Sequence, residues 1–598
     1  MEERTIDRAR FQKMLKGRAV TVTQVPPGYA RELAQRISVA SGRRDVSLQT
    51  MAEHLAFFDL LLQDVHVASP AGQLAVLDER GRPTVAGQAI EGYVRASQGK
   101  SEFFDADMYM LQVTGLRLPH RVLTHPVPSA SNSRFEVWHT DPEDRRHIPP
   151  PGDEGVLFSA SDFSIVNCGN RTRRAAKRSW RVDLRTPGGG GCCLNGMARI
   201  RLMAMYNDPS QMREALAWRL FSRSGVPSPR HTYAKLAFGA NYRGLFSVIE
   251  QVDKRFLRDH FGKNHWGNLY KARGSGDIGG ATLEYRTGSD GDDTGRQYFS
   301  QGAGRHTYTL RTNKNNSEAN TYDDLACLLR TINAIGLPSG PKRFDTDAYR
   351  ESMDRIMNTR AFLRWAGVNI LLGGWDNYFA SPSNYYLYNS GREGAEKDFV
   401  ASPYFTFIPW DYDNCLGIDY FGISWQYADI LDWPRNTVPY WKNRRPSRIP
   451  LVQHLLSNHD YLQYYIDHIE YLLDTRFSPK AIAAQIGREF EGGLWDRVRQ
   501  ASYLESATPN GRPFTGRQFT NHEVYWNGYR QRELRHGKAK IEGIIHYVRM
   551  RRDSARASLK ELRKTMPCVT GGGEFAATME PLPRLPMCDS CLHGPPQR

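Results

Sequence analysis

The stretch that most constrains the fold of this chain runs over residues 373–417. It begins GGWDNYFASPSNYYLY, passes through a variable connector, and ends FTFIPWDYDNCLG. The runs YYLY and YFTFI predict two strands, because aromatic and β-branched side chains pack well on a pleated sheet. We therefore expect a β-hairpin. Asp376 precedes its first strand, and Asp411 and Asp413 follow its second, so acidic side chains should lie at its open end.

The polar residues around this hairpin come in an order that suits phosphoryl transfer. Such a reaction needs an acid near the acceptor hydroxyl, then an Asn and a downstream Asp that hold Mg²⁺ against the nucleotide phosphates. Asp376, Asn384 and Asp411 follow in that order. Carboxylate and amide oxygens are ligands that suit Mg²⁺ or Mn²⁺. Asp and Asn also cap turns, so the spacing alone leaves a purely structural role open.

The charge of the chain is its unusual bulk property. Its 598 residues include 80 Lys and Arg against 64 Asp and Glu, a net charge of +16. This excess favours anionic partners such as nucleotide, nucleic acid, acidic protein or a membrane surface. Because the Arg residues are scattered, we interpret much of the charge as solvated surface. No nucleic-acid-binding motif and no GxxxxGK[ST] string occurs, so we expect neither a nucleic-acid partner nor a P-loop enzyme.

The cysteines and the N-terminal residues bear on the compartment. Eight cysteines are few for this length and predict no disulfide framework. Cys588 and Cys591 form a CxxC in a Pro-rich tail, and whether they bind a metal stays open. Residues 1–15 lack the apolar core of a signal peptide, and no apolar run is long enough to span a bilayer. We expect a cytoplasmic protein without a transmembrane segment, with association to a surface or coat left open.

The chain divides into three predicted parts. Residues 1–140 form an accessory region that is largely helical, because apolar positions recur there at three- and four-residue spacing. A Pro- and charge-rich loop follows at 141–153. Residues 154–565 combine strand and helix patterns and form the main domain. The Gly/Pro-rich residues 566–598 form a predicted disordered tail.

Two predicted helices lie within the main domain. Asp208 begins one of them after a strand at 200–205, because Asp is a good N-cap and Pro209 fits the first turn. The other spans residues 348–372 and is apolar on nearly every face toward its end, as a buried helix is. It ends at two glycines and delivers the chain to Asp376.

The hairpin string WDNY…NYYLY…FIPWDYDN resembles the core of the CotH family, the spore-coat-associated protein kinases with an atypical kinase-like fold. The resemblance covers most of the chain and implies an α+β, two-lobed kinase-like fold with a helical C-terminal lobe beside the N-terminal helical region. The other segments that resemble the family follow in the same order. They are CGNRTRRAAKRSW at 168–180, residues 200–221, YRGLFSVIEQVDKRFL at 242–257 and GNLYKAR at 267–273.

The resemblance implies a role for each residue at the hairpin. Asp376 would orient or deprotonate the acceptor hydroxyl. Asn384 and Asp411 would hold Mg²⁺ or Mn²⁺, and Asp413 would support that metal site.

The nucleotide-binding residues are implied in the same way, with ATP as the cofactor. The family has an Arg-Gly-Asn-Ser-Thr turn followed by Lys-Lys-Ser, which places Asn170 over the phosphates and makes Lys177 their cation. Glu214 would brace the cation. Glu250 lies near the expected adenine-contacting hinge, and Lys271 lies just past it.

Two positions depart from the family pattern. Cys168 stands where the family has the Arg of that turn, and Met203 stands where a Lys is expected before the helix. Without a cation at position 203, another side chain must hold the phosphates. Lys177, Arg201 and Lys271 are the candidates.

The sequence thus predicts ATP- and metal-dependent phosphoryl transfer to Ser or Thr hydroxyls of a protein substrate. Three alternatives remain: a nucleotide-binding pseudokinase, a structural coat-type protein, and a different transferase, moving AMP or forming an amide, on the same fold. Met203 favours the first two.

Overall fold

A computed structural model of the chain describes much of its central part. Asn170, the first 108 residues and the tail with Cys588 and Cys591 lie outside the described residues. The described residues are 109–569 except 115, 117–124, 130–131, 140–155, 170–176, 185–196, 240, 274–279, 286–306, 396, 436–447, 487–533 and 537–538.

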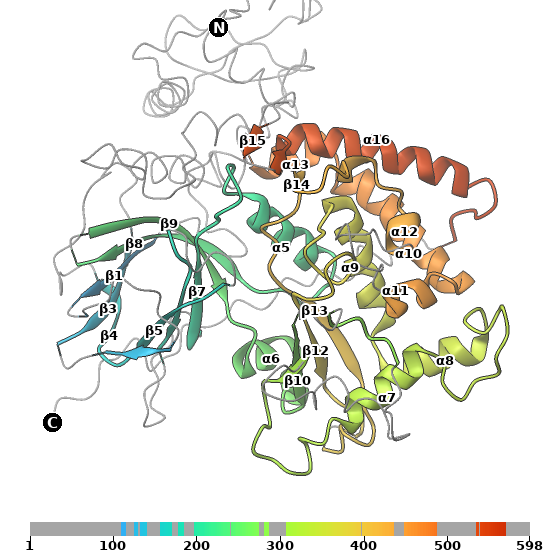
Figure 1. Ribbon diagram of the computed structural model, residues 1–598, viewed down its shortest axis with the longest axis horizontal. Coiled ribbons are helices and arrows are strands. Elements are labelled where there is room, and N and C mark those ends of the chain that lie inside the picture. Colours follow the sequence, from blue (N-terminus) through green and yellow to red (C-terminus); the bar gives the residue numbers. More distant parts are fainter. Residues whose placement is uncertain are drawn as a thin grey trace, which may run out of the picture.

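The N-terminal half of the described chain forms a curled nine-stranded sheet of order β2-β5-β6-β7-β9-β8-β1-β3-β4 (Figure 1). Only the β1–β8 pair is parallel among these described strands. The strands are β1 (Tyr109–Thr114), β2 (Val127–Pro128), β3 (Arg134–His139), β4 (Val156–Ala160), β5 (Ser164–Asn167), β6 (Trp180–Asp183), β7 (Arg199–Met203), β8 (His231–Phe238) and β9 (Asn241–Glu250).

One face of this sheet encloses an apolar core, and the other packs against the rest of the molecule through residues such as Leu245 and Ile249. Along β7, Ile200 and Leu202 are buried in the core with Phe246 of β9. Because successive side chains of a strand point to opposite faces, Arg201 and Met203 lie on the other face. That second face is the one that matters for the site below.

The described residues of the predicted accessory region are strands. β1, β2 and β3 all come from within residues 1–140, and β1 pairs with both β3 and β8. The sheet therefore begins before the expected boundary at 154. The segment YMLQVT gains its strand structure from β3 and from β8, and β8 lies more than a hundred residues further along the chain, which a local pattern does not reveal.

A second, four-stranded sheet of order β11-β10-β12-β13 lies beside the first. Its strands are β11 (Tyr308–Leu310), β10 (Asn268–Ala272), β12 (Tyr385–Asn389) and β13 (Phe405–Pro409). Helix α5 (Arg213–Arg223) follows β7, and α6 (Lys254–Phe261) follows β9. A small sheet joins β14 (Ile418–Asp419) to β16 (Ala539–Ile541) and β15 (Leu534–His536).

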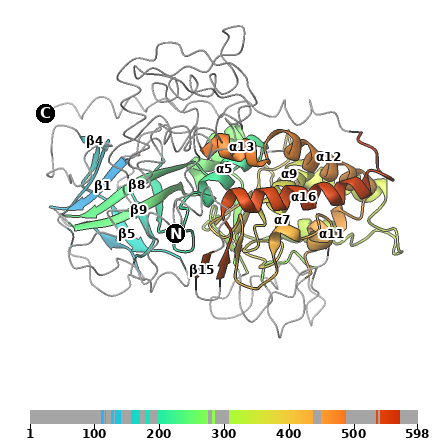
Figure 2. The same cartoon turned by 90° about the horizontal axis from the view of Figure 1, so that it is seen from above.

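The remaining helices gather on one side of the molecule, with α16 lying across α9 and α12 (Figures 1 and 2). None of the described helices has the length and apolar character needed to cross a bilayer. They are α7 (Asp323–Ile332), α8 (Asp347–Ile356), α9 (Thr359–Leu372), α10 (Asp432–Arg435), α11 (Pro450–Leu455), α12 (His459–Thr475), α13 (Pro479–Ile486) and α16 (Ile544–Leu562). The fold is a mixed α+β fold, as predicted.

The helix predicted over 348–372 is two helices. Met357 between them is extended, and the Asn358 side chain caps α9 by accepting a hydrogen bond from the Ala361 amide at 3.0 Å. The apolar period continues across this break, which is why the pattern predicted one helix. The predicted end is confirmed, because Gly373 closes α9 in the left-handed conformation with φ of 60°.

Candidate active site

The predicted hairpin is present and brings the predicted acids and Asn384 to one end. β12 and β13 pair antiparallel, with Tyr385 opposite Pro409. Immediately beyond this pair, the Trp410 amide donates to the Asn384 carbonyl at 3.1 Å. The Asn384 side-chain amide donates to the Asp376 carbonyl at 2.8 Å. Asp376, Asn384 and Asp411 are thus held at the same end of the hairpin.

Two of these residues have an unusual backbone. Asn384 has φ of 53° and Asp411 has φ of 65°, in the left-handed region where non-glycine residues are uncommon. Asn and Asp tolerate this conformation better than other residues. Such conformations concentrate at functional sites, where the surrounding structure holds them in place. The hydrogen bond to the Asp376 carbonyl uses the amide nitrogen of Asn384. The side-chain oxygen of Asn384 is therefore left for another ligand.

The carboxylates near the hairpin end influence one another. Burial raises the pKa of Asp413 well above its ordinary value, and the charges of Asp411, Glu214 and Asp376 raise it further. Burial also raises the pKa of Asp411, although Lys271 and Arg201 oppose the shift. Protons or a cation would relieve this concentration of negative charge.

Glu214 brings a third element to this group. It lies in the first turn of α5 and is only 3% exposed. Burial, followed by the charge of Asp411, raises its pKa to about 8. Its Oε2 accepts a hydrogen bond from the Ser247 hydroxyl at 3.5 Å, and its Oε1 is buried without a partner in the described part of the chain.

These residues fit a hard divalent cation. Carboxylate and amide oxygens are its usual ligands, and Mg²⁺ is commonly held by one or two carboxylates together with substrate phosphates. A buried carboxylate oxygen without a partner marks a place where a cation would be favourable. Among the described residues, a tight group of three acid, Cys or His ligands occurs only at Asp467, Glu470 and Cys568, where Arg563 already pairs with both acids. Within the part of the chain that the structure describes, the hairpin acids do not form such a tight group on their own, so a metal held there would need further ligands such as substrate phosphates.

Position 203 lies directly beside Glu214, as the expected lysine would. Ser247, which donates to Glu214, is the cross-strand partner of Met203 on β7. Directly opposed residues of an antiparallel pair have neighbouring side chains on one face. Met203 packs instead against the apolar cluster that includes Trp410 and Tyr386. Glu214 consequently has no lysine at position 203 to brace.

Cations come to this site from other strands. Lys271 of β10 lies over the rings of Tyr386 and Trp410, at 5.3 and 5.5 Å from their centroids. Arg201 of β7 lies 5.3 Å from the Trp410 ring and donates to the Gln251 side chain at 2.7 Å. Gln251 in turn donates to the Tyr386 hydroxyl at 3.3 Å. Sequence reasoning did not single out Trp410 or Tyr386. Trp410 directly precedes a predicted metal ligand and Tyr386 follows another by two residues, so both positions were natural places to look. Gln251 was expected near the adenine-contacting hinge.

Lys177 and Glu250 are held elsewhere. The Lys177 ammonium lies 4.9 Å from the Phe246 ring centroid. Phe246 points into the core of the nine-stranded sheet, whereas its neighbour Ser247 points to Glu214. The buried Glu250 carboxylate accepts hydrogen bonds from the Arg230 guanidinium at 2.6 and 3.0 Å.

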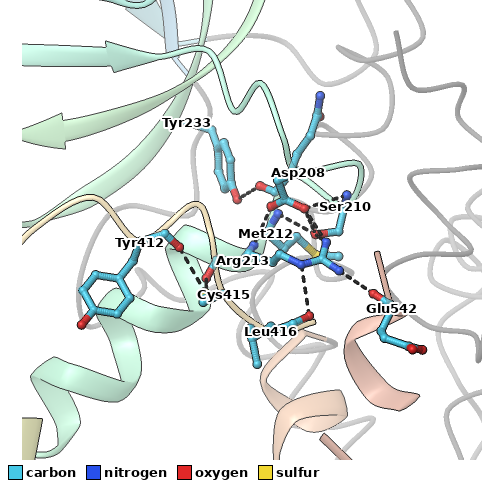
Figure 3. A network of polar contacts seen from close by, with 10 residues as sticks. Asp208, Ser210, Met212, Arg213, Tyr233, Tyr412, Cys415, Leu416 and Glu542 are labelled. Atoms are coloured by element: carbon cyan, nitrogen blue, oxygen red, sulfur yellow. Dashed lines mark hydrogen bonds and ion pairs between the residues drawn. The ribbon is translucent and has the colours of Figure 1, made fainter. Parts of the chain in front are cut away.

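Behind the acidic group, the start of α5 is tied to the chain that follows the hairpin (Figure 3). Arg213 is fully buried and pairs with Asp208 at 2.6 Å. The same guanidinium donates to the carbonyls of Leu416 and Glu542, at 3.2 and 2.5 Å. This network fixes Glu214, the next residue, relative to Asp411 and Asp413.

The chain belongs to the CotH kinase family. A family model described as CotH kinase protein matches residues 165–491, which is more than half of the chain. The described site lies within these residues, and the expected family resemblance is confirmed.

Two relatives show how distant the similarity is. The chain is 23% identical over 306 residues to inner spore coat protein H of Bacillus subtilis (strain 168), an alignment that covers 51% of this chain and 70% of that protein. It is 22% identical over 333 residues to invasin CotH2 of Rhizopus delemar, covering 53% of this chain and 48% of that protein. The chain thus spans about half the length of the second relative.

Proposed function

We propose that this chain is an ATP- and divalent-metal-dependent kinase that transfers the γ-phosphoryl group of ATP to Ser or Thr hydroxyls of a protein substrate. The observation that carries the proposal is the end of the β12–β13 hairpin. There the Asn384 side-chain amide donates to the Asp376 carbonyl, and the Asn384 carbonyl accepts from the amide of Trp410, the residue before Asp411. In this proposal the curled sheet and the helical part are the two lobes of a kinase-like fold, and the site lies where they meet.

The residues have distinct roles in the proposed reaction. Asp376 orients the acceptor hydroxyl and accepts its proton. The Asn384 side-chain oxygen and the Asp411 carboxylate hold Mg²⁺ or Mn²⁺, and Asp413 supports them. The metal, when bound, supplies positive charge that offsets the negative charge of the transferred phosphoryl group. It also stabilises the ionised form of Asp411, whose pKa burial raises in the protein without metal.

The cation that would hold the phosphates is not at position 203. Lys271 and Arg201 take its place in this proposal, because both lie beside Trp410, the residue before Asp411. Glu214 then acts on the metal side of the site, beside Asp411, instead of bracing a lysine. We include Asn170 and Lys177 near the phosphates in this proposal, as the sequence predicts.

A second candidate is transfer of AMP, which the acids of the hairpin fit equally well and which the position of Lys271 and Arg201 beside Trp410 allows. Cations that lie away from the usual lysine position would change the orientation of the bound nucleotide. The same acids would then act at the α-phosphorus instead of the γ-phosphorus. Loss of catalysis, with nucleotide binding retained, is the other outcome that Met203 allows.

The test is label transfer to the protein itself and to a mixed protein substrate, with Mg²⁺ or Mn²⁺ and ATP labelled at either the γ- or the α-phosphate. Asp376→Asn and Asp411→Asn are the site variants. Asp398→Asn is the matched control, because Asp398 is an exposed acid in the connector of the same hairpin. We expect γ-label on protein, reduced at least about a hundredfold by both site variants and unchanged by the control.

Other outcomes identify other functions. Transfer of the α-label identifies the protein as an AMP transferase. Transfer of neither label, in a protein that binds ATP with metal, identifies a pseudokinase and overturns the proposal. Equal activity in wild type and Asp411→Asn removes the metal role of the hairpin.

A further inference from the structure

Four side chains form a hydrogen-bonded network in the core behind the hairpin end. Two of them come from α9, one from the loop that follows α9, and one from the loop that follows β13. Each is 3% exposed or less. They are Trp365, Asn369, Asn377 and Tyr412, and we call them the buried network.

The hydroxyl of Tyr412 is the centre of this network. It accepts a hydrogen bond from the Trp365 indole at 2.7 Å and donates to the Asn369 side-chain oxygen at 3.0 Å. The same Asn369 oxygen accepts from the Asn377 side-chain amide at 2.8 Å. One buried oxygen atom of α9 therefore joins Tyr412 to Asn377.

The Asn377 side chain ties together the backbone on both sides of Asp376. Its amide donates to the Gly374 carbonyl at 2.8 Å, and its oxygen accepts from the Phe379 amide at 3.2 Å. The conformation of the loop around Asp376 thus depends on a side chain that belongs to the buried network.

Tyr412 is in turn part of the loop that carries the other acids of the hairpin. It lies between Asp411 and Asp413 in the sequence. Its ring packs edge-on against Trp218 and Phe221 of α5, at centroid distances of 5.4 and 4.5 Å. Because the ring is held by α5 and the hydroxyl by α9, Tyr412 fixes this loop against both helices.

The backbone leaves room for the buried network at one glycine. A Cβ added to Gly374 would lie 2.4 Å from the Asn369 oxygen, 3.0 Å from the Asn377 amide nitrogen and 3.1 Å from the Tyr412 ring. The first distance is shorter than real Cβ contacts. The three polar side chains therefore meet at a point where the chain requires glycine.

Burial alone does not require polar side chains here. Asn369 lies on α9 among the buried apolar residues Val368, Ile370 and Leu371. A buried hydrogen bond adds little net stability, but a satisfied network of directed bonds favours one arrangement of its atoms. Catalytic groups must be held to within about 0.5 Å, and a displacement of about 1 Å can cost about a hundredfold in rate. The buried network is suited to that task.

We propose that Tyr412 is a positioning residue whose hydroxyl, through Asn369, fixes the loop of Asp376 relative to the loop of Asp411. The inference rests on the proposed function, in which the acceptor hydroxyl lies at Asp376 and the metal-bound phosphates lie at Asp411. It deepens that function by naming the side chains that set the distance between the acceptor and the phosphoryl donor. The Tyr412 hydroxyl is engaged by Trp365 and Asn369, so its role is to hold the acids in place.

The experiment compares Tyr412→Phe with Tyr349→Phe in the full chain. Tyr349 is a matched control, because it is 0% exposed and its hydroxyl donates to the Ile332 carbonyl at 3.2 Å, outside the buried network. Transfer of γ-label gives kcat and the KM for ATP. Hydrogen exchange, measured by mass spectrometry without nucleotide or metal, follows the backbone amides of residues 374–384 and 410–417. Thermal unfolding confirms that each variant is folded.

Tyr412→Phe should lower kcat about ten- to a hundredfold and keep the KM for ATP within about threefold of wild type. It should also make exchange at least about threefold faster in both segments, because one hydroxyl holds both loops. Tyr349→Phe should keep kcat within about twofold of wild type and leave exchange in both segments unchanged.

Asn369→Leu breaks the same connection from the side of α9. If Tyr412 and Asn369 act as one unit, the double variant should lose no more kcat than the more damaging single variant. Losses that multiply would show two independent effects and would overturn the inference.

The outcome for this inference can be told apart from the outcome for the kinase. A folded Tyr412→Phe protein with the kcat of wild type overturns the inference and leaves the kinase function in place. If wild type transfers no label, the kinase function is lost and hydrogen exchange decides the inference by itself. Faster exchange in both segments of Tyr412→Phe alone then supports it, and exchange like that of Tyr349→Phe, or faster exchange in only one segment, overturns it.

Discussion

At the scale of single residues, Glu214 is unusual because its carboxyl is buried close to other acids. It is 3% exposed, it faces the acids of the hairpin, and Met203 stands where a lysine would pair with it. Its pKa in the folded protein, about 8, lies above the value of about 4.3 expected in the unfolded chain. Folding therefore favours the protonated form.

The consequence for stability follows from linkage. A carboxyl with a raised folded pKa contributes stability below its unfolded pKa and loses that contribution as the pH rises through the folded pKa. The metal-free protein should lose about 2–4 kcal/mol between about pH 4.5 and 8 from this group. Glu214→Gln should flatten much of this fall, and Met203→Lys should do the same by pairing with the carboxylate. Urea unfolding at several pH values measures it, and equal pH profiles for wild type and Glu214→Gln would contradict the prediction.

At the scale of elements, the approach of α9 to α12 depends on one small residue. A Cβ added to Gly367 would lie 2.8 Å from Nδ1 of the buried His468 ring and 3.4 Å from Ile469. The 2.8 Å contact is shorter than real Cβ contacts, and the 3.4 Å contact is at the short limit of ordinary van der Waals contact. Gly367 thus sets how closely the helix that leads to Asp376 packs on its neighbour.

Gly367→Ala should destabilise the protein by about 1–3 kcal/mol, because overpacking outweighs the better helix propensity of Ala. Gly340→Ala is the matched control, since nothing lies within 4 Å of its added Cβ. The free energies of unfolding in urea give the comparison. If both variants match wild type, α9 and α12 separate without cost and the packing argument fails.

At the scale of the whole molecule, Arg213 joins three distant parts of the chain. Its guanidinium pairs with Asp208, and it donates to carbonyls of Leu416 beyond the hairpin and of Glu542 beside β16 (Figure 3). Asp208 and Arg213 are 1% and 0% exposed. A buried ion pair of this kind contributes little beyond a well-packed apolar pair, but removing one partner leaves a buried charge without compensation.

Arg213→Met should cost about 3–5 kcal/mol of folding free energy. The double variant Asp208→Asn with Arg213→Met should recover part of that loss, because the unpaired carboxylate is then gone. Arg355→Met, an exposed arginine at the end of α8, should stay within about 0.5 kcal/mol of wild type. Denaturant unfolding of wild type, Arg213→Met, Asp208→Asn and the double variant tests the coupling, and additive losses would show that the pair is not a unit.

The local parts of this protein can be predicted from its amino-acid sequence. The hairpin, its two strands, the order of Asp376, Asn384 and Asp411, and the glycine that ends α9 were all predictable, because each depends on residues close together in the chain. The break at Met357 was not predictable, because the apolar period of the sequence continues through it.

Which residues from distant segments meet at this hairpin depends on how the whole chain folds. The tertiary structure placed Lys177 over Phe246, on the core side of β9, and brought Arg201 and Lys271 to Trp410 from two different sheets. It also built β1 and β3 into the nine-stranded sheet from a region predicted to be helical. The physical reason is the same in each case: strand pairing and register are set by partners far along the chain, and a shift of one residue exchanges the two faces of a strand.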